Sequence, residues 1–278
     1  MAGRLEGKVA VITGGGSGIG RDSVLHFLGE GASVVIGDLN EKRARETIEL
    51  AAARSAADRV LFIRTDVSSE ADVEAMIELA SREFGRVDCI FNNAGLMGAI
   101  GKIEEVSADD WDFTFSVLVK GVFFGLKYGA RVMKTQGHGG SIINTGSIAG
   151  LSGGCGPHAY SAAKAAVVNL TRSVSVELAK HKIRVNCVCP GGILTPLVHR
   201  GNEEVLEEPM RQAQPLKEVG RGTDIAAMAV FLASEEARFI TGAVIVVDGG
   251  VTAAGPHVYH GQWEAAMGSG VDRGTIDL

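Results

Sequence analysis

The sequence predicts an α/β fold, a single-domain doubly wound sheet of about seven parallel strands with helices on both faces. Short β-branched or apolar runs alternate along the chain with longer segments of helical period, the pattern of repeated strand–helix units. Several of the short runs are almost wholly apolar, as expected when helices cover both faces of the sheet. The 278 residues, 46% of them hydrophobic, are sufficient for one sizeable core.

The expected strands share short length and β-branched or apolar content. In chain order they are Val9–Thr13, Ser33–Gly37, Val60–Thr65, Val87–Asn92, Gly140–Thr145, Ile183–Cys189 and Ala243–Val247. The first is followed by a glycine-rich turn and a helical run through Glu30. Further helices are expected at Glu41–Ala57, Glu70–Phe84, Ala108–Met133, Ala159–His181 and Thr223–Ala233.

Two segments depart from this alternation. Between Pro190 and Leu216, glycines and prolines interrupt any long element, which predicts a mobile insertion with a short helix near Glu203. Residues 251–278 have little periodicity and five glycines. We therefore expect one domain, residues 1–250, followed by a tail, 251–278, that either packs on a neighbouring subunit or is a frayed end.

Composition excludes several classes of function. The net charge is −6, and the 27 Lys and Arg form no basic stripe, so a nucleic-acid partner is not expected. The sequence has no apolar run of 18 residues, and its first eight residues lack secretory-signal features, which predicts a cytoplasmic protein without a membrane partner. The four cysteines form no CxxC pair, so we expect buried free thiols and no metal site.

A dinucleotide site is predicted where the first strand ends. Glycines from Gly14 to Gly20 suit a sharp turn that brings the backbone close to a pyrophosphate, whose charge a helix N-terminus favours. Asp38 ends the second strand, where an acidic residue accepts hydrogen bonds from the adenosine ribose and repels a 2′-phosphate. NAD(H) therefore fits better than NADP(H), although Arg43 is nearby. The alternative is that Asp38 only caps the helix beginning at Glu41.

A proton-handling group is predicted on the helix that begins near Ala159. Tyr160 and Lys164 are four residues apart and so lie on one face, one turn from each other. A cation beside a phenol favours the ionised form, which suits Tyr160 to act as a general base. Ser147, at the end of the preceding strand, could donate a hydrogen bond to the same substrate oxygen.

Together these segments resemble the short-chain dehydrogenase/reductase family, a group of NAD-binding Rossmann-fold oxidoreductases, from about Leu5 to Gly250. The motifs that carry the resemblance are Thr13-Gly-Gly-Gly-Ser-Gly-Ile-Gly20, Asp66-Val67, Asn92-Asn-Ala-Gly95, Gly146-Ser-Ile-Ala-Gly150, Tyr160-Ser-Ala-Ala-Lys164, Arg184-Val-Asn-Cys-Val-Cys-Pro-Gly191 and Asp248-Gly-Gly250. The resemblance implies Ser147, Tyr160 and Lys164 as catalytic residues, direct hydride transfer, and no metal.

The resemblance also implies where the cofactor binds. Its contacts are expected from Gly14, Ser17, Gly18, Ile19, Gly20, Asp38, Leu39, Asp66, Val67, Asn93, Ala94, Gly95, Tyr160, Lys164, Pro190, Gly191, Ile193 and Thr195. Within this set Asp66 and Val67 flank the adenine, and Lys164 holds the nicotinamide ribose. The substrate contacts expected are Met97, Ser147, His158, Tyr160 and Leu197, within an apolar surrounding that also includes Leu96, Ile148, Leu151, Ile193, Leu194 and Val198.

One residue departs from the family pattern. Leu118 stands where the family has an asparagine associated with a water beside the lysine, and leucine cannot supply an amide's hydrogen bonds. We expect the Leu118 backbone carbonyl to bind that water instead, so that activity survives.

The predicted function is hydride transfer between NAD(H) and a secondary alcohol/ketone pair, hydrophobic or cyclic because the expected substrate contacts are mainly apolar. Two alternatives remain: an NADPH-dependent ketone reductase, and a noncatalytic NAD-binding regulatory subunit. By resemblance, a homo-oligomer, dimer or tetramer, is also expected.

Overall fold

The computed structural model describes residues 3–54 and 56–254. In this part of the chain, seven parallel strands form one sheet in the order β3-β2-β1-β4-β5-β6-β7. The strands are β1 (Val9–Thr13), β2 (Ser33–Asp38), β3 (Val60–Arg64), β4 (Cys89–Asn92), β5 (Gly140–Thr145), β6 (Ile183–Pro190) and β7 (Val244–Val247). From β1 the chain adds β2 and β3 on one side, and then adds β4 to β7 on the other side. The predicted doubly wound sheet is therefore confirmed.

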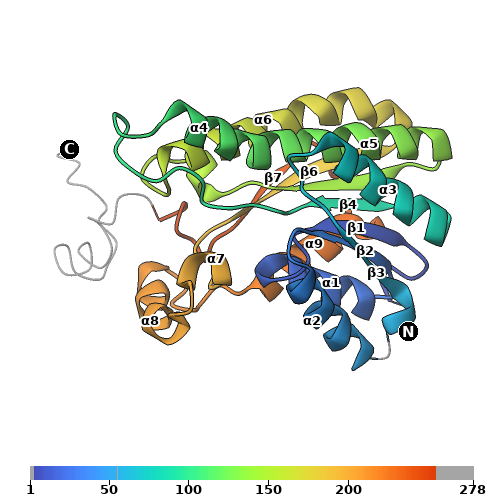
Figure 1. Ribbon diagram of the computed structural model, residues 1–278, viewed down its shortest axis with the longest axis horizontal. Helices are drawn as coiled ribbons and strands as arrows, with labels where there is room; N and C mark the ends of the chain where they lie inside the picture. The colour runs from blue at the N-terminus through green and yellow to red at the C-terminus, as the bar shows by residue number, and fades with distance from the viewer. Residues whose placement is uncertain (1–2, 55, 255–278) are drawn as a thin grey trace, which may run out of the picture.

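Helices cover both faces of the sheet (Figure 1). One face carries α1 (Gly18–Gly29), α2 (Glu41–Ala52) and α9 (Gly222–Ala233), and the other carries α3 (Glu70–Phe84), α5 (Gly121–Gln136) and α6 (His158–Leu178). Alternate residues of β1 enter the two cores: Val9 and Val11 face one, and Ala10 and Ile12 the other. Burial on both faces explains why this strand is apolar throughout.

The helix predicted over Ala108–Met133 is not regular. It consists of α4 (Ala108–Phe115), a π-helical turn over Ser116–Lys120, and α5, which extends to Gln136. The segment before Gly121 contains neither proline nor glycine, so its periodicity gave no sign of the wider turn.

Several element boundaries also differ from the prediction, and hydrogen bonds accompany two of these differences. β4 begins at Cys89 and not at Val87, because the Gln136 side chain occupies both backbone groups of Val87: it accepts from the N–H at 2.8 Å and donates to the carbonyl at 2.9 Å. α2 ends at Ala52 and not at Ala57, and the chain then turns so that the Ala56 N–H donates to the Ala51 carbonyl.

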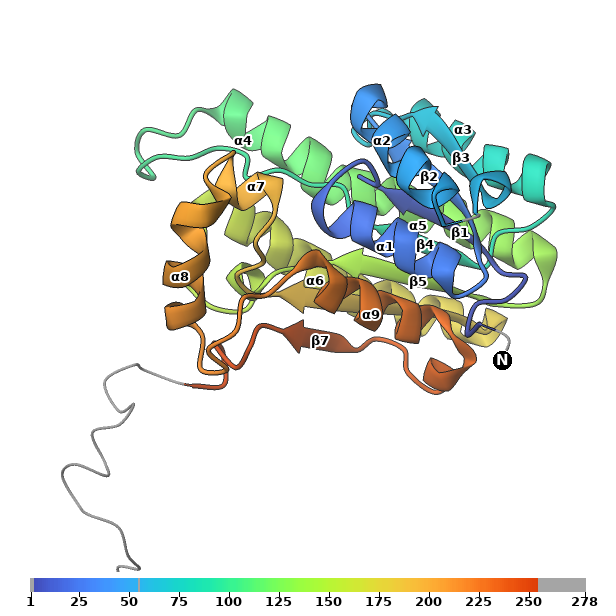
Figure 2. The ribbon, with the colours of Figure 1, turned by 90° about the horizontal axis from the view of Figure 1, so that it is seen from below.

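The Pro190–Leu216 segment contains two helices, α7 (Pro196–His199) and α8 (Glu203–Ala213), so the short helix expected near Glu203 is confirmed. Figure 2 shows both at the end of the sheet toward which β7 points. Of the predicted tail, 251–278, only residues 251–254 are among those described. No helix in the described ranges is long and apolar enough to span a bilayer.

Candidate active site

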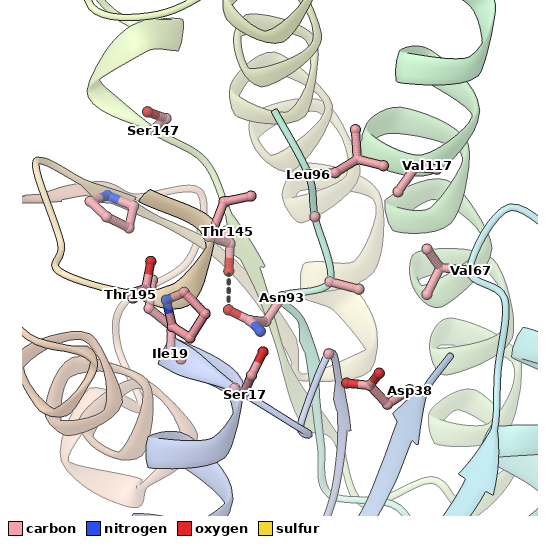
Figure 3. Close-up of a pocket in the computed structure, with 18 of the residues that line it drawn as sticks. Ser17, Ile19, Asp38, Val67, Asn93, Leu96, Val117, Thr145, Ser147 and Thr195 are labelled. Carbon is pink, nitrogen blue, oxygen red and sulfur yellow. Dashed lines mark hydrogen bonds between the residues drawn. The ribbon is translucent and has the colours of Figure 1, made fainter. Parts of the chain in front are cut away.

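A cavity of about 380 Å³ lies at the carboxyl ends of the strands. Most of its lining comes from the turns after β1 to β6, which parallel strands bring to one edge of the sheet. All eighteen positions predicted to contact the cofactor line it, and so do Ser147 and Leu197. In Figure 3, Asp38 and Ser147 lie at opposite ends of this space.

The glycine-rich loop has the backbone shape that a close approach to a ligand requires. Gly14 adopts a φ of +71°, and a Cβ at Gly20 would lie 2.0 Å from the Gly14 carbonyl oxygen, so neither position accepts a side chain without strain. α1 begins at Gly18, and in the described structure the Ser17 side chain makes no capping hydrogen bond. The first N–H groups of α1 are therefore available to an anion such as a pyrophosphate.

Asp38 is held at the other side of this loop. Its Oδ2 accepts from the Gly16 N–H at 2.9 Å, and its Oδ1 accepts from the Asn40 N–H at 2.8 Å. The N-cap of α2 is Asn40, whose side chain accepts from the Arg43 N–H at 3.0 Å. Asp38 is thus not the cap of this helix, and its carboxylate lines the cavity as a ribose-binding acid would.

The floor of the cavity is tied to β1 by Thr13, which is 3% exposed. The Thr13 hydroxyl accepts from the N–H groups of both Asn93 and Ala94, each at 2.9 Å. The Asn93 side chain donates to the Thr13 carbonyl at 3.0 Å, and the Thr145 hydroxyl donates to its oxygen at 3.4 Å (Figure 3). Three neighbouring strands are therefore cross-linked beneath the cavity.

Asp66 and Val67 line the cavity from the loop after β3. The Asp72 carboxylate holds this loop: Oδ2 accepts from the Asp66 N–H at 2.9 Å, and Oδ1 accepts from the Ser69 hydroxyl at 2.9 Å. These hydrogen bonds, that from Asp66 first, lower the pKa of Asp72 below its usual value.

Ser147, Tyr160 and Lys164 come together in the same cavity. Lys164, 4% exposed, donates from Nζ to the Thr145 carbonyl at 2.7 Å and lies 5.6 Å from the centre of the Tyr160 ring. The Ser147 hydroxyl accepts from the Ala149 N–H at 3.1 Å. Gly150 makes this approach possible, because a Cβ there would lie 2.6 Å from the Lys164 carbonyl carbon.

Leu118 is 1% exposed, lies in the π-helical turn, and is not among the cavity-lining residues. Its Cδ2 would lie 3.3 Å from a Cβ at Gly95, and the Lys164 Nζ 4.0 Å from the same point. An apolar side chain is therefore packed against the cavity floor at Gly95, near the lysine, where the family pattern has an amide.

Two predicted substrate contacts lie outside the cavity lining. These are Met97, which is partly buried, and His158, which is exposed at the start of α6. The lining also includes Leu96 and Val198, which the resemblance places around the substrate. The other lining residues, which were not among the predicted contacts, are Gly37, Arg43, Thr65, Phe113, Val117, Thr145, Gly146 and Pro196. Phe113 and Val117 are four residues apart, a spacing that could have identified them as one helix face.

None of the four cysteines is among the residues that line the cavity. All four are free; Cys89, Cys187 and Cys189 are buried, whereas Cys155 is exposed in a glycine-rich surface turn, so the prediction of buried thiols was wrong there. Burial raises the pKa of Cys89 to about 12, which keeps it protonated. Within residues 3–54 and 56–254, no cluster of three or more metal-ligating side chains occurs.

The chain is similar to known oxidoreductases over most of its length. A family model described as enoyl-(acyl carrier protein) reductase matches residues 14–252. Xanthoxin dehydrogenase from Arabidopsis thaliana is 41% identical over 260 residues, 90% of this chain and 91% of the relative. 3β-Hydroxysteroid dehydrogenase 2 from Eggerthella lenta is 40% identical over 254 residues, 90% and 96% of the two chains. A crystal structure of levodione reductase matches with a TM-score of 0.84 and 36% identity, covering 90% of this chain and 99% of that one.

Proposed function

Since the chain belongs to the short-chain dehydrogenase/reductase family and is therefore an oxidoreductase, we propose that it transfers hydride between NAD(H) and a secondary alcohol/ketone pair that is hydrophobic or cyclic. The observation that carries the proposal is the joint presence of Ser147, Tyr160 and Lys164 in one cavity with Asp38 at its far end. A protein that only bound the dinucleotide would have no need of the first three.

The described residues fit a nicotinamide dinucleotide. Gly14 and Gly20 let the loop pack closely on itself and on the Asn93–Ala94 backbone, where side chains would clash, and the first turn of α1 offers its N–H groups to the pyrophosphate. Asp38 would accept hydrogen bonds from the adenosine ribose, and Asp66 and Val67 would flank the adenine. When bound, the dinucleotide supplies the hydride acceptor or donor.

The protein's own part in the reaction is to hold the substrate oxygen and move its proton. In alcohol oxidation, Tyr160 acts as the general base that takes the hydroxyl proton, with the Lys164 ammonium 5.6 Å from the centre of its ring. The Ser147 hydroxyl donates a hydrogen bond to the same oxygen. In ketone reduction Tyr160 returns the proton. The Lys164 contact with the Thr145 carbonyl fixes the ammonium in place.

The substrate class rests on the apolar side of the cavity. Leu96, Leu197 and Val198 line it near the site together with Phe113, whose side chain is 56% exposed. Such walls favour an apolar or cyclic substrate. One relative is named for a hydroxysteroid and another structure for levodione, names that agree with this class.

One observation favours the alternative cofactor. Arg43 lines the cavity beside Asp38, and a guanidinium is a suitable partner for a 2′-phosphate. We nevertheless propose NAD(H), because Asp38 is held in place by two backbone N–H groups and would repel that phosphate.

Self-association is part of the proposal. The family resemblance predicts a dimer or tetramer, and a subunit contact would bury large exposed apolar side chains such as Phe239, 95% exposed, and Val176 of α6, 79% exposed. Sedimentation equilibrium would measure the oligomeric state.

The test is NADH formation at alkaline pH with NAD and a panel of cyclic, aromatic and aliphatic secondary alcohols, repeated with NADP. Tyr160→Phe should abolish turnover, whereas the matched variant Tyr128→Phe, which removes a hydroxyl bonded to Glu70 of α3 outside the cavity lining, should retain it. Equal turnover in wild type and Tyr160→Phe would remove Tyr160 from the mechanism. A strong preference for NADP would contradict the assignment of Asp38.

A further inference from the structure

Arg21 lies behind the glycine-rich loop and not in the cavity that the loop lines. Its guanidinium donates to the Gly16 carbonyl from both Nε, at 3.0 Å, and Nη2, at 2.7 Å. The same Nη2 forms an ion pair with Glu46 of α2 at 2.8 Å. Arg21 is 26% exposed in its side chain, so these contacts are only partly screened by water.

Thr47 completes this attachment. Its hydroxyl lies 3.1 Å from the Gly15 carbonyl oxygen and 3.1 Å from the Arg21 Nε. Thr47 is fully buried. Two successive carbonyls of the loop are therefore held from behind by α1 and α2 together.

Gly16 connects Arg21 to Asp38 through the two peptide units that flank its Cα. Arg21 binds the Gly16 carbonyl, while the Gly16 N–H donates to the Asp38 Oδ2 at 2.9 Å. The fit is close, since a Cβ at Gly16 would lie 2.9 Å from that oxygen and 3.1 Å from the Ala44 nitrogen. A shift of Gly16 would therefore change the orientation of the carboxylate.

We propose that Arg21 is a positioning residue that, through Gly16, fixes the Asp38 carboxylate in the orientation that accepts the ribose hydroxyls and excludes a 2′-phosphate. This inference rests on the proposed binding of NAD(H). Arg21 would thus influence the preference for NAD(H) over NADP(H) although it does not line the cavity.

The experiment measures dissociation constants for NADH and NADPH by fluorescence titration of the full-length protein. Arg21→Met should weaken NADH binding about tenfold and leave NADPH binding nearly unchanged, so that the ratio of the two constants falls. The KM for NAD should rise while kcat at saturating NAD stays within about twofold. The matched control is Arg45→Met, which removes an exposed arginine of α2 that pairs with Glu41, and it should change neither constant.

Two further variants separate the contact with Gly16 from the ion pair with Glu46. Arg21→Lys keeps a charge for Glu46 but cannot form the two-pronged contact with the Gly16 carbonyl, so discrimination should still fall. Glu46→Gln removes the ion pair and leaves the contact with Gly16, so discrimination should persist. If Arg21→Lys kept the discrimination between NADH and NADPH and Glu46→Gln lost it, the role of Arg21 would be purely structural. These two variants give that answer even if Arg21→Met fails to fold.

A double-mutant cycle tests whether Arg21 acts through Asp38. If Arg21 acts through Asp38, Arg21→Met should have little effect on NADH affinity in an Asp38→Asn background. Additive losses would overturn the proposal. Failure of the proposed function looks different, because wild-type protein would then bind neither nucleotide, or would prefer NADPH.

Discussion

Replacing Thr13 by valine should destabilise the protein and weaken dinucleotide binding together. Valine keeps the β-branched shape and the β1 backbone but removes the hydroxyl that accepts from the Asn93 and Ala94 N–H groups, each at 2.9 Å. A buried donor left without a partner costs about 1–3 kcal/mol. The two groups are only partly buried, so we take the lower half of that range and expect a total loss of about 2–4 kcal/mol.

Urea unfolding would measure this loss, and NADH titration would measure its effect on the cavity floor. Thr13→Ser is the matched control, because serine retains the hydroxyl and loses only a methyl group; it should recover most of the free energy of unfolding. The reasoning would be refuted by a valine variant as stable as wild type, or by serine and valine variants that are equally destabilised.

Three other predictions concern the site. Tyr160→Phe should lower kcat by about 10²–10⁴-fold while NADH binding, measured by fluorescence, stays within about twofold; an unchanged kcat would contradict the assigned proton transfer. Leu118→Asn should lower the free energy of unfolding by about 1–3 kcal/mol, because it buries an amide at a site that is 1% exposed, and should change turnover less than about tenfold; a rise of orders of magnitude would show that the backbone carbonyl does not replace the family's asparagine. Asp72→Asn should destabilise the protein at neutral pH, and this difference should shrink as the pH falls below about 4. The sign follows from a folded-state pKa that is lowered by the hydrogen bond from Asp66: the carboxylate stabilises the fold above the unfolded pKa, and its contribution is lost as the pH falls through the folded one. A difference in urea midpoint that does not vary with pH would contradict it.

Much of the fold could be predicted because its strands and helices satisfy their own local patterns. β1, β5 and α3 have the predicted bounds, and in each the hydrophobic period matches the burial. Val87 did not join β4, because the side chain of Gln136, 49 residues away, bonds its backbone groups. No local pattern contains a contact at that separation.

The cofactor side of the cavity was more predictable than the substrate side. Glycines at positions such as Gly20 are required by backbone clashes that any sequence with this loop would meet. Phe113, Val198 and the other apolar lining residues belong to helices and loops whose orientation depends on packing. His158, a predicted substrate contact, is exposed at the start of α6 and lies outside the cavity lining. It stands two residues before Tyr160, which places it about 160° away around the helix.

The π-helical turn at Ser116–Lys120 bears on how the family's asparagine position tolerates leucine. A π turn accommodates one more residue than an α turn. The side chains of α4 are therefore rotated about the helix axis relative to the positions that a continuous α-helix with α5 would give them. Val117 lines the cavity while Leu118 is buried beneath it. Deleting one residue from this turn would rotate everything before it by about 100° about the helix axis and would turn Phe113 away from the cavity. The length of this turn, and not only its composition, thus determines which side chains the substrate meets.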